Sequence, residues 1–187
     1  MNAQQPHSPN RYLELLNLKT REEAYKWVKK MASDLSEDEH TVRSCIFDLH
    51  ASVELELRRI YYHLFKQLLF LTDDEAENEK TLAEFNKTIS NVSFGQMYRV
   101  LQPIMNKWYG EFENIGDVNE TRNLAAHHSD IAKVLYKGRS PFSDADCFAQ
   151  MAFDVWAIKQ SMPKFFWHTI EKPREKLRRY YEKFGDI

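Results

Sequence analysis

The sequence is poor in cysteine, glycine and proline, with two, five and six of these residues in 187. Cys45 and Cys147 lie far apart and form no CxxC pair, so we expect two reduced core residues in place of a disulfide or a reactive thiol. The few glycines and prolines fall mainly between segments with helical patterning. This distribution favours helices over the many short turns of a β-sandwich.

Strong net charge and long hydrophobic runs are also missing. The formal net charge is -2, which excludes a general nucleic-acid coating protein and leaves only local contacts with nucleic acid. No apolar run approaches the length of a bilayer span, and the first ten residues lack the basic start and apolar centre of a signal peptide. We therefore expect a cytoplasmic protein without a membrane partner.

The residues that are present are those of a folded protein. Hydrophobic residues make up 43% of the chain and charged residues 29%, close to the average for globular domains. We predict an all-α fold, with a flexible N-terminal tail over residues 1–10 and a single helical domain over 11–187.

Capping signals and apolar periodicity predict a long central helix with flanking helices. Thr20 with Glu23, and Ser36 with Glu39, have the spacing of a capping box. After the second pair, apolar residues recur every three or four positions, which predicts one long helix. They are Val42, Ile46, Leu49, Val53, Leu57, Ile60, Leu64 and Leu68.

Six further helices and a basic terminal helix are predicted around it. Their ranges are 11–16, 21–32, 75–90, 94–109, 117–136 and 144–170, and the terminal helix starts at Pro173. Ser93 is the expected cap of the helix over 94–109, and Pro103 should kink or end that helix. Asp117 and Glu120 form a capping pair for the helix over 117–136, and Gly138 suits its C-terminal end.

The clearest functional clue is the segment Arg122-Asn123-Leu124-Ala125-Ala126-His127-His128. We expect it in the first turns of the helix over 117–136. At about 100° per residue, Leu124, His128, Ile131 and Leu135 form a buried stripe on that helix. Arg122 and His127 then border its polar face, about 140° apart.

An arginine and a histidine on one surface suit phosphodiester chemistry without a metal. Imidazole moves protons near neutral pH, whereas guanidinium stays charged and offers a planar fork of donors to a phosphate. His127 would take a proton from a ribose 2′-hydroxyl or give one to the leaving oxygen, while Arg122 would stabilise the charge on the phosphoryl group. Two copies across a symmetric dimer would supply the second histidine that acid–base cleavage needs.

These residues resemble the HEPN superfamily. Arg122 to His127 matches the Rx4-6H motif, including a polar residue, Asn123, directly after the arginine. Glu54 to Arg59 resembles the ExxxKR element of many HEPN proteins, with Arg58 in place of the lysine. The resemblance covers roughly residues 42–136.

The resemblance implies a HEPN-like helical bundle that forms a homodimer. Many HEPN domains are metal-independent endoribonucleases of toxin–antitoxin, abortive-infection and other defence systems, and others are non-catalytic dimerisation or binding modules. The first case implies catalytic Arg122 and His127 and an RNA substrate, with an antitoxin or neighbouring-system protein as a further partner. The supporting residues are then Asn123, Glu54, Arg58 and His128.

Several alternatives stay open at the sequence level. Some HEPN toxins carry Rx4HxY, but Ser129 stands here in place of that tyrosine, so silencing by its modification is not expected. Glu54 either orients Arg122 or Arg58 or forms a surface ion pair. The basic terminal helix, with Tyr180 and Tyr181, is either a solvated helix end or a contact for an RNA backbone.

No metal site or cofactor is predicted. The segment from Glu37 to His40 has the ExxH spacing of di-iron bundles, but that chemistry needs two such motifs and two further carboxylates. His50 and His63 stand on the same predicted helix as Glu54, without a recognised ligand spacing. The sequence contains no HExxH motif, glycine-rich phosphate loop or GxSxG nucleophile.

Overall fold

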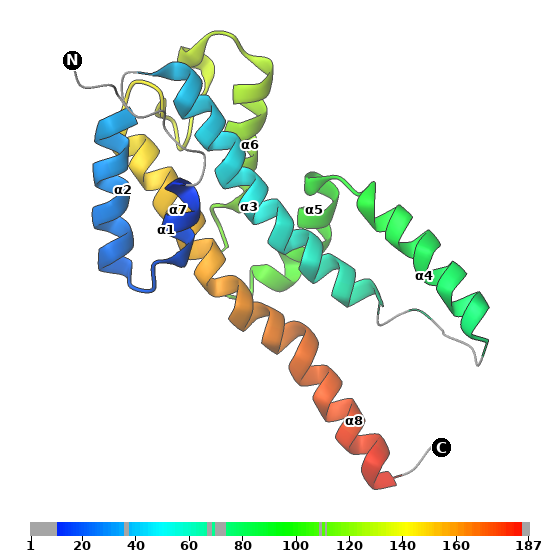
Figure 1. Ribbon diagram of the computed structural model, residues 1–187. Helices are drawn as coiled ribbons and strands as arrows, with labels where there is room; N and C mark the ends of the chain where they lie inside the picture. The colour runs from blue at the N-terminus through cyan, green and yellow to red at the C-terminus, as the bar shows by residue number, and fades with distance from the viewer. Residues whose placement is uncertain are drawn as a thin grey trace. The chain divides into compact units, whose positions relative to one another are not determined.

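The chain folds into α-helices. The computed structural model describes residues 11–35, 38–66, 69, 74–108, 110 and 112–184, so the predicted tail over 1–10 lies outside the described residues. The α-helices are α1 (Arg11–Asn17), α2 (Arg21–Leu35), α3 (Glu39–Lys66), α4 (Glu75–Ser90), α5 (Phe94–Met105), α6 (Ile115–His127), α7 (Ala145–Phe166) and α8 (Lys172–Phe184) (Figure 1). No β-strand occurs in these ranges, which confirms the all-α class.

The helices fall into two compact units. Unit 1 contains residues up to Val53 together with Glu111–Gln160, and unit 2 contains Glu54–Gly110 and the residues from Ser161 onwards. The long helices α3 and α7 each contribute residues to both units. A single domain over 11–187 stays a prediction.

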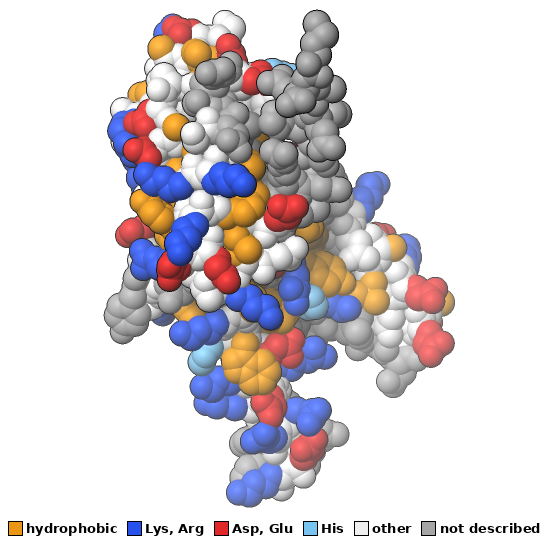
Figure 2. All heavy atoms as spheres, turned by 60° about the vertical axis from the view of Figure 1, so that its left-hand side comes forward, with side chains coloured by type: hydrophobic (Ala, Val, Ile, Leu, Met, Phe, Trp, Pro, Cys, Tyr) orange, Lys and Arg blue, Asp and Glu red, His pale blue; other side chains and the backbone are white. Residues whose placement is uncertain are grey.

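The surface carries mixed charge. Figure 2 shows charged side chains of both signs over the visible face, with hydrophobic side chains in small groups among them. Among the helices of the described ranges, none is both long enough and apolar enough to span a bilayer.

The predicted central helix is confirmed as α3, which is 28 residues long. The first six residues of its apolar stripe, Val42 to Ile60, are each no more than 2% exposed. Burying one such side chain stabilises a fold by about 1.5–3 kcal/mol, so this stripe anchors both cores. Leu64 is half-buried, and Leu68 and the expected cap Ser36 lie outside the described residues.

Two of the other capping predictions are also confirmed. Thr20 and Glu23 exchange hydrogen bonds at the start of α2, with both backbone N–H groups 3.3 Å from the partner's side-chain oxygen. Ser93 and Gln96 form a complete capping box at the start of α5. Pro103 lies in the last turn of α5, which ends at Met105 and not at residue 109.

The helix that carries the motif differs from the prediction. It begins at Ile115, with Asn114 as its N-cap, so Asp117 and Glu120 do not form its capping pair. It ends at His127 because His128 is extended, with φ −111° and ψ 126°. Downstream, the Asp130 carboxylate accepts from the Ala132 N–H at 3.1 Å and starts a short 3₁₀ turn, η1 (Ile131–Lys133). Such local side-chain bonds compete with helix continuation.

Because α6 ends early, its buried face and the position of the motif along the helix both differ from the prediction. The buried residues are Ile115, Val118, Thr121 and Ala125, whereas the predicted stripe residue Leu135 is 40% exposed. The motif therefore occupies the last turns of the helix and not the first. Gly138 has the expected positive φ of 78°, but it does not end a helix. Together with Lys137, whose φ is 49°, it forms a tight turn between Tyr136 and Arg139, which pair through their backbones.

The C-terminal helices also differ from the prediction. A π-helical segment, η2 (Trp167–Glu171), joins α7 directly to α8, so helical structure runs through the expected break at Pro173. The Lys172 N–H bonds to the Trp167 carbonyl, one residue further back than in an α-helix. This wider turn precedes Pro173. In an ordinary α-helix the ring of a proline clashes with the carbonyl four residues earlier, and the proline has no N–H to donate.

A buried polar cluster closes the segment after α6 onto α7 within unit 1. Asp154, only 6% exposed, accepts hydrogen bonds from the Tyr136 hydroxyl at 2.6 Å, the Lys137 ammonium at 3.0 Å and the Gln150 amide at 2.8 Å. Burial and the bond to Asp154 raise the pKa of the Tyr136 phenol far above its usual 10.0. The folded chain therefore holds this proton more tightly than the unfolded chain.

This pKa shift predicts a loss of stability in alkali. Above about pH 10 the unfolded state releases the Tyr136 proton and the folded state keeps it, so the free energy of unfolding falls by about 1.4 kcal/mol per pH unit. Tyr136→Phe should start about 1 kcal/mol lower at neutral pH, through the lost hydrogen bond, and fall less steeply above pH 10. Urea unfolding across this pH range measures both curves. Parallel curves for the two proteins would contradict the account.

Candidate functional site

Four of the predicted site residues lie together at the C-terminal end of α6. Arg122 is half-buried, Asn123 and His127 are exposed, and His128 is half-buried. The Arg122 Nη1 donates to the Asn123 Oδ1 at 3.1 Å. Its guanidinium lies over the ring of Phe47 from α3, 5.5 Å from the ring centroid. The polar residue after the arginine thus holds the guanidinium.

An open hollow lies beside the motif. The α3 residues Glu39, Arg43 and Phe47 line one side, and the segment from Ala125 to Ser129 lines the other. His127 and Phe47 therefore line the same hollow. The Arg122 guanidinium contacts the Phe47 ring and does not itself line the hollow. Phe47, which sequence reasoning did not single out, contacts the Arg122 guanidinium and lines the hollow that His127 also lines.

Arg43 determines how the motif helix ends. It donates through Nη1 to the carbonyl oxygens of Ala125 and His128, the latter at 3.1 Å, and pairs through Nη2 with Glu39 at 3.0 Å. The last carbonyls of a helix have no partner inside it and carry partial negative charge, so a guanidinium stabilises them. In the sequence, Arg43 reads only as an i,i+4 partner of Glu39, which gives no signal of this role.

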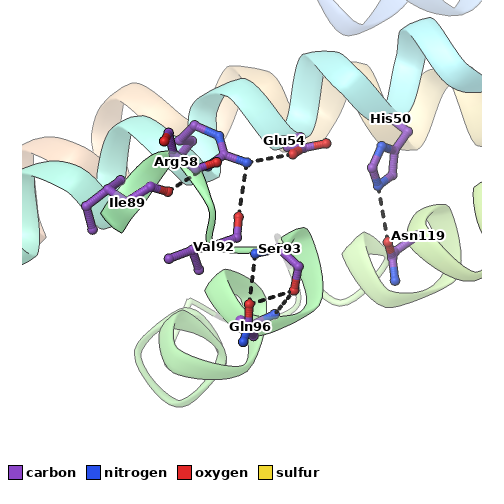
Figure 3. Close-up of polar contacts among 9 residues, drawn as sticks. His50, Glu54, Arg58, Ile89, Val92, Ser93, Gln96 and Asn119 are labelled. Carbon is purple, nitrogen blue, oxygen red and sulfur yellow. Dashed lines mark hydrogen bonds and ion pairs between the residues drawn. The ribbon is translucent and has the colours of Figure 1, made fainter. Parts of the chain in front are cut away.

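A second polar contact fixes α6 on the other side of the motif. His50 of α3 is only 4% exposed, and its Nε2 lies 3.2 Å from the Asn119 Oδ1 of α6 (Figure 3). Because an amide oxygen only accepts, Nε2 carries the proton in this contact. Asn119 precedes Arg122 by one helical turn, so α3 holds α6 before the motif through His50 and at its end through Arg43.

Glu54 and Arg58, the other two predicted site residues, belong to unit 2. Arg58 donates to Glu54 at 2.8 Å, to the Ile89 carbonyl at 2.9 Å and to the Val92 carbonyl at 3.1 Å, with a longer bond to the Ser90 carbonyl (Figure 3). These carbonyls lie at the C-terminal end of α4. Glu54 and Arg58 form an i,i+4 ion pair, and through it Glu54 contacts a guanidinium that caps a helix.

His128 does not belong to a helical stripe, since it is the extended C-cap residue that follows α6. Its N–H donates to the Leu124 carbonyl at 2.9 Å, and its own carbonyl accepts from Arg43. His128 therefore contributes through its backbone to the geometry of the motif's end.

The paired metal ligands and the reactive thiols that other chemistry would need are not found among the described residues. In the part of the chain that the structure describes, no three His, Cys, Asp or Glu side chains gather in a way that could hold a metal ion. Cys45 and Cys147 are both buried and neither forms a disulfide, as the sequence predicted. Burial raises the pKa of the Cys147 thiol to about 11, which disfavours the nucleophilic thiolate.

Comparison with known proteins gives no assignment, because no family model, no curated protein and no solved structure matches this chain.

The contacts of Arg58 predict a structural effect of its substitution. Arg58→Gln should lower the free energy of unfolding by about 2 kcal/mol, since hydrogen bonds from a charged donor to the end of α4 are lost. Arg58→Lys should recover only part of this, because an ammonium cannot match a fork of donors. Urea denaturation provides the measurement. The exposed Arg99→Gln is the control and should stay within about 0.5 kcal/mol of the parent. An Arg58→Gln midpoint equal to that of the control would refute the capping role.

Proposed function

We propose that this chain is a metal-independent endoribonuclease of the HEPN type. The observation that carries the proposal is that His127 lines an open hollow together with Phe47, and that the Arg122 guanidinium lies over the Phe47 ring. An exposed imidazole and a guanidinium on one helix supply proton transfer and phosphate binding without a metal. The match to Rx4-6H supports the same chemistry.

The proposed reaction is a transesterification within the RNA backbone. The ribose 2′-oxygen attacks the phosphorus and the bond to the 5′-oxygen breaks, which leaves a 2′,3′-cyclic phosphate and a 5′-hydroxyl. A base removes the proton of the 2′-hydroxyl, an acid gives one to the leaving oxygen, and His127 performs one of these transfers. Arg122 stabilises the added negative charge on the phosphoryl oxygens.

A homodimer would complete the site. With one His127 in each copy, a two-fold axis near the hollow would bring an acid and a base to the same phosphate. Asn123 supports Arg122 through their hydrogen bond, and the backbone of His128 supports His127 through the end of α6. Glu54 and Arg58 would act less directly, through the part of α3 that caps α4. A role in toxin or defence systems, with an antitoxin or neighbouring-system protein, rests on the resemblance alone.

Removal of either motif side chain should abolish RNA cleavage. In EDTA, His127→Ala and Arg122→Ala should each lower the cleavage rate of end-labelled RNA by about a hundredfold or more, the scale of acid–base and charge stabilisation. The products should carry 2′,3′-cyclic phosphates, and RNA with 2′-O-methyl groups should resist cleavage.

Matched controls separate this result from contamination and unfolding. His40→Ala removes an exposed histidine of α3, and Arg99→Ala removes an exposed arginine of α5, so both should cleave at the parent rate. Circular dichroism and size-exclusion chromatography verify folding and oligomeric state. Equal cleavage by the parent and the His127→Ala protein would disprove the assignment.

A second candidate is a non-catalytic HEPN-like module for dimerisation or for protein or RNA binding. The observation in its favour is that the Arg122 guanidinium already contacts Asn123 and Phe47, as a structural arginine would. A folded dimer that does not cleave RNA, and whose association weakens when Arg122 is replaced, would favour this module over the nuclease.

A further inference from the structure

Positive charge is concentrated at the C-terminal end of the chain. Residues 164–184 contain seven lysines and arginines and three glutamates, a formal charge of +4 in a chain whose total is -2. The segment includes the end of α7, η2 and α8. Figure 2 shows Lys and Arg side chains gathered along the lower part of the view, where α8 lies, with acidic side chains between them.

An exposed aromatic ring lies within this charge. Trp167, the first residue of η2, is 47% exposed and lines an open hollow with Glu171, Arg174, Glu175 and Arg178. It is the only exposed large hydrophobic side chain of residues 164–184 among those that the structure describes. An exposed indole between guanidinium groups is typical of a surface for a planar ligand.

The second part of α3 adds cations to the same region of unit 2. The Arg59 guanidinium lies 4.7 Å from the ring centroid of Phe166, the neighbour of Trp167 in the chain. The His63 ring meets Phe166 edge-on, with centroids 5.2 Å apart. Burial lowers the pKa of His63, and so does the charge of Arg59, Lys66 and Arg174, while Glu171 acts in the opposite sense. Cations of α3 and α8 therefore both influence His63, the histidine that contacts Phe166.

Part of the charge remains available to a ligand. Glu175 pairs with Arg179, and Glu182 pairs with Arg178 at 3.2 Å, so two of the three glutamates are already engaged by arginines. Lys172, Arg174 and Lys176 are exposed, and none of them forms an ion pair within the described part of the chain. A polyanion on this surface would meet Arg174, which has no ion-pair partner in the described part of the chain, whereas Arg178 and Arg59 each pair with one glutamate, Glu182 and Glu56.

We infer that this surface, the Trp167 surface, formed by Arg59, Lys66, Trp167, Arg174 and Arg178, binds single-stranded nucleic acid. Its arginines and lysine bind phosphates, and one unstacked base lies on the Trp167 indole. A duplex keeps its bases inside, so it offers no ring to the indole. A lipid surface fits less well because glutamates alternate with the cations along this segment.

This inference is independent of the proposed nuclease. The Trp167 surface belongs to unit 2, whereas Arg122 and His127 belong to unit 1. An oligothymidylate has no 2′-hydroxyl and cannot undergo the proposed cleavage, so it reports binding alone. Its affinity should be the same for the parent and for His127→Ala, whether or not the parent cleaves RNA.

Fluorescence anisotropy with a labelled oligothymidylate of about 12 nucleotides, within the range of sites on such proteins, tests the surface. Arg174→Gln combined with Arg178→Gln should weaken binding at least tenfold and reduce the slope of log affinity against log salt by about 1.4, since each phosphate contact contributes about 0.7. Trp167→Ala should weaken binding about tenfold without changing the slope. Trp167→Phe, which keeps an aromatic face, should retain most of the affinity.

The control removes two exposed cations elsewhere. Arg99→Gln combined with Lys133→Gln changes the net charge by the same amount and should leave the affinity within about twofold of the parent. An equal loss of affinity in this control would show that only the net charge matters, and would overturn the inference. Full affinity of the Trp167→Ala protein would also overturn it. Vesicles of phosphatidylcholine with phosphatidylserine should not compete with the oligonucleotide. Binding to these vesicles without binding to the oligonucleotide would replace nucleic acid with a membrane surface.

Discussion

The need to satisfy the carbonyl groups at helix C-termini governs much of this structure. Those groups have no partner within their own helix and carry partial negative charge. Two arginines of α3 meet the need, since Arg43 binds the end of α6 in unit 1 and Arg58 binds the end of α4 in unit 2. The apolar stripe of α3 supplies both cores with buried side chains, so one helix contributes both packing and capping.

The same constraint links the fold to the candidate site. Because Arg43 binds the carbonyls of Ala125 and His128, the turn that carries His127 ends at a defined point beside Phe47. His127 is exposed there, and its backbone is held by a neighbouring helix. An exposed side chain on a fixed backbone is what the proposed proton transfer requires, because geometry must be kept while the imidazole stays accessible to RNA.

The sequence predicted the features that depend on local pattern. The α3 stripe and the Thr20 and Ser93 caps follow from periodicity and spacing. Arg122, Asn123 and His127 were correctly expected on one helix, whereas His128 lies just beyond its end. The end of α6 was predicted wrongly, since the apolar pattern continues past His127 while the Asp130 carboxylate bonds locally. Arg43 and Phe47 were missed because their partners lie far along the chain, and a surface arginine and a capping arginine look the same in a sequence.

Amide hydrogen exchange in the Arg43→Met protein tests the central claim most directly. Methionine keeps much of the aliphatic body and removes the donors, so the last turn of α6 should open more often. The account predicts at least about tenfold faster exchange for the amides of Ala126, His127 and His128, the effect of losing a charged hydrogen bond. Exchange in α4, which Arg58 caps, should stay unchanged. Unchanged protection at the end of α6, or equal loss of protection in both helices, would contradict the account.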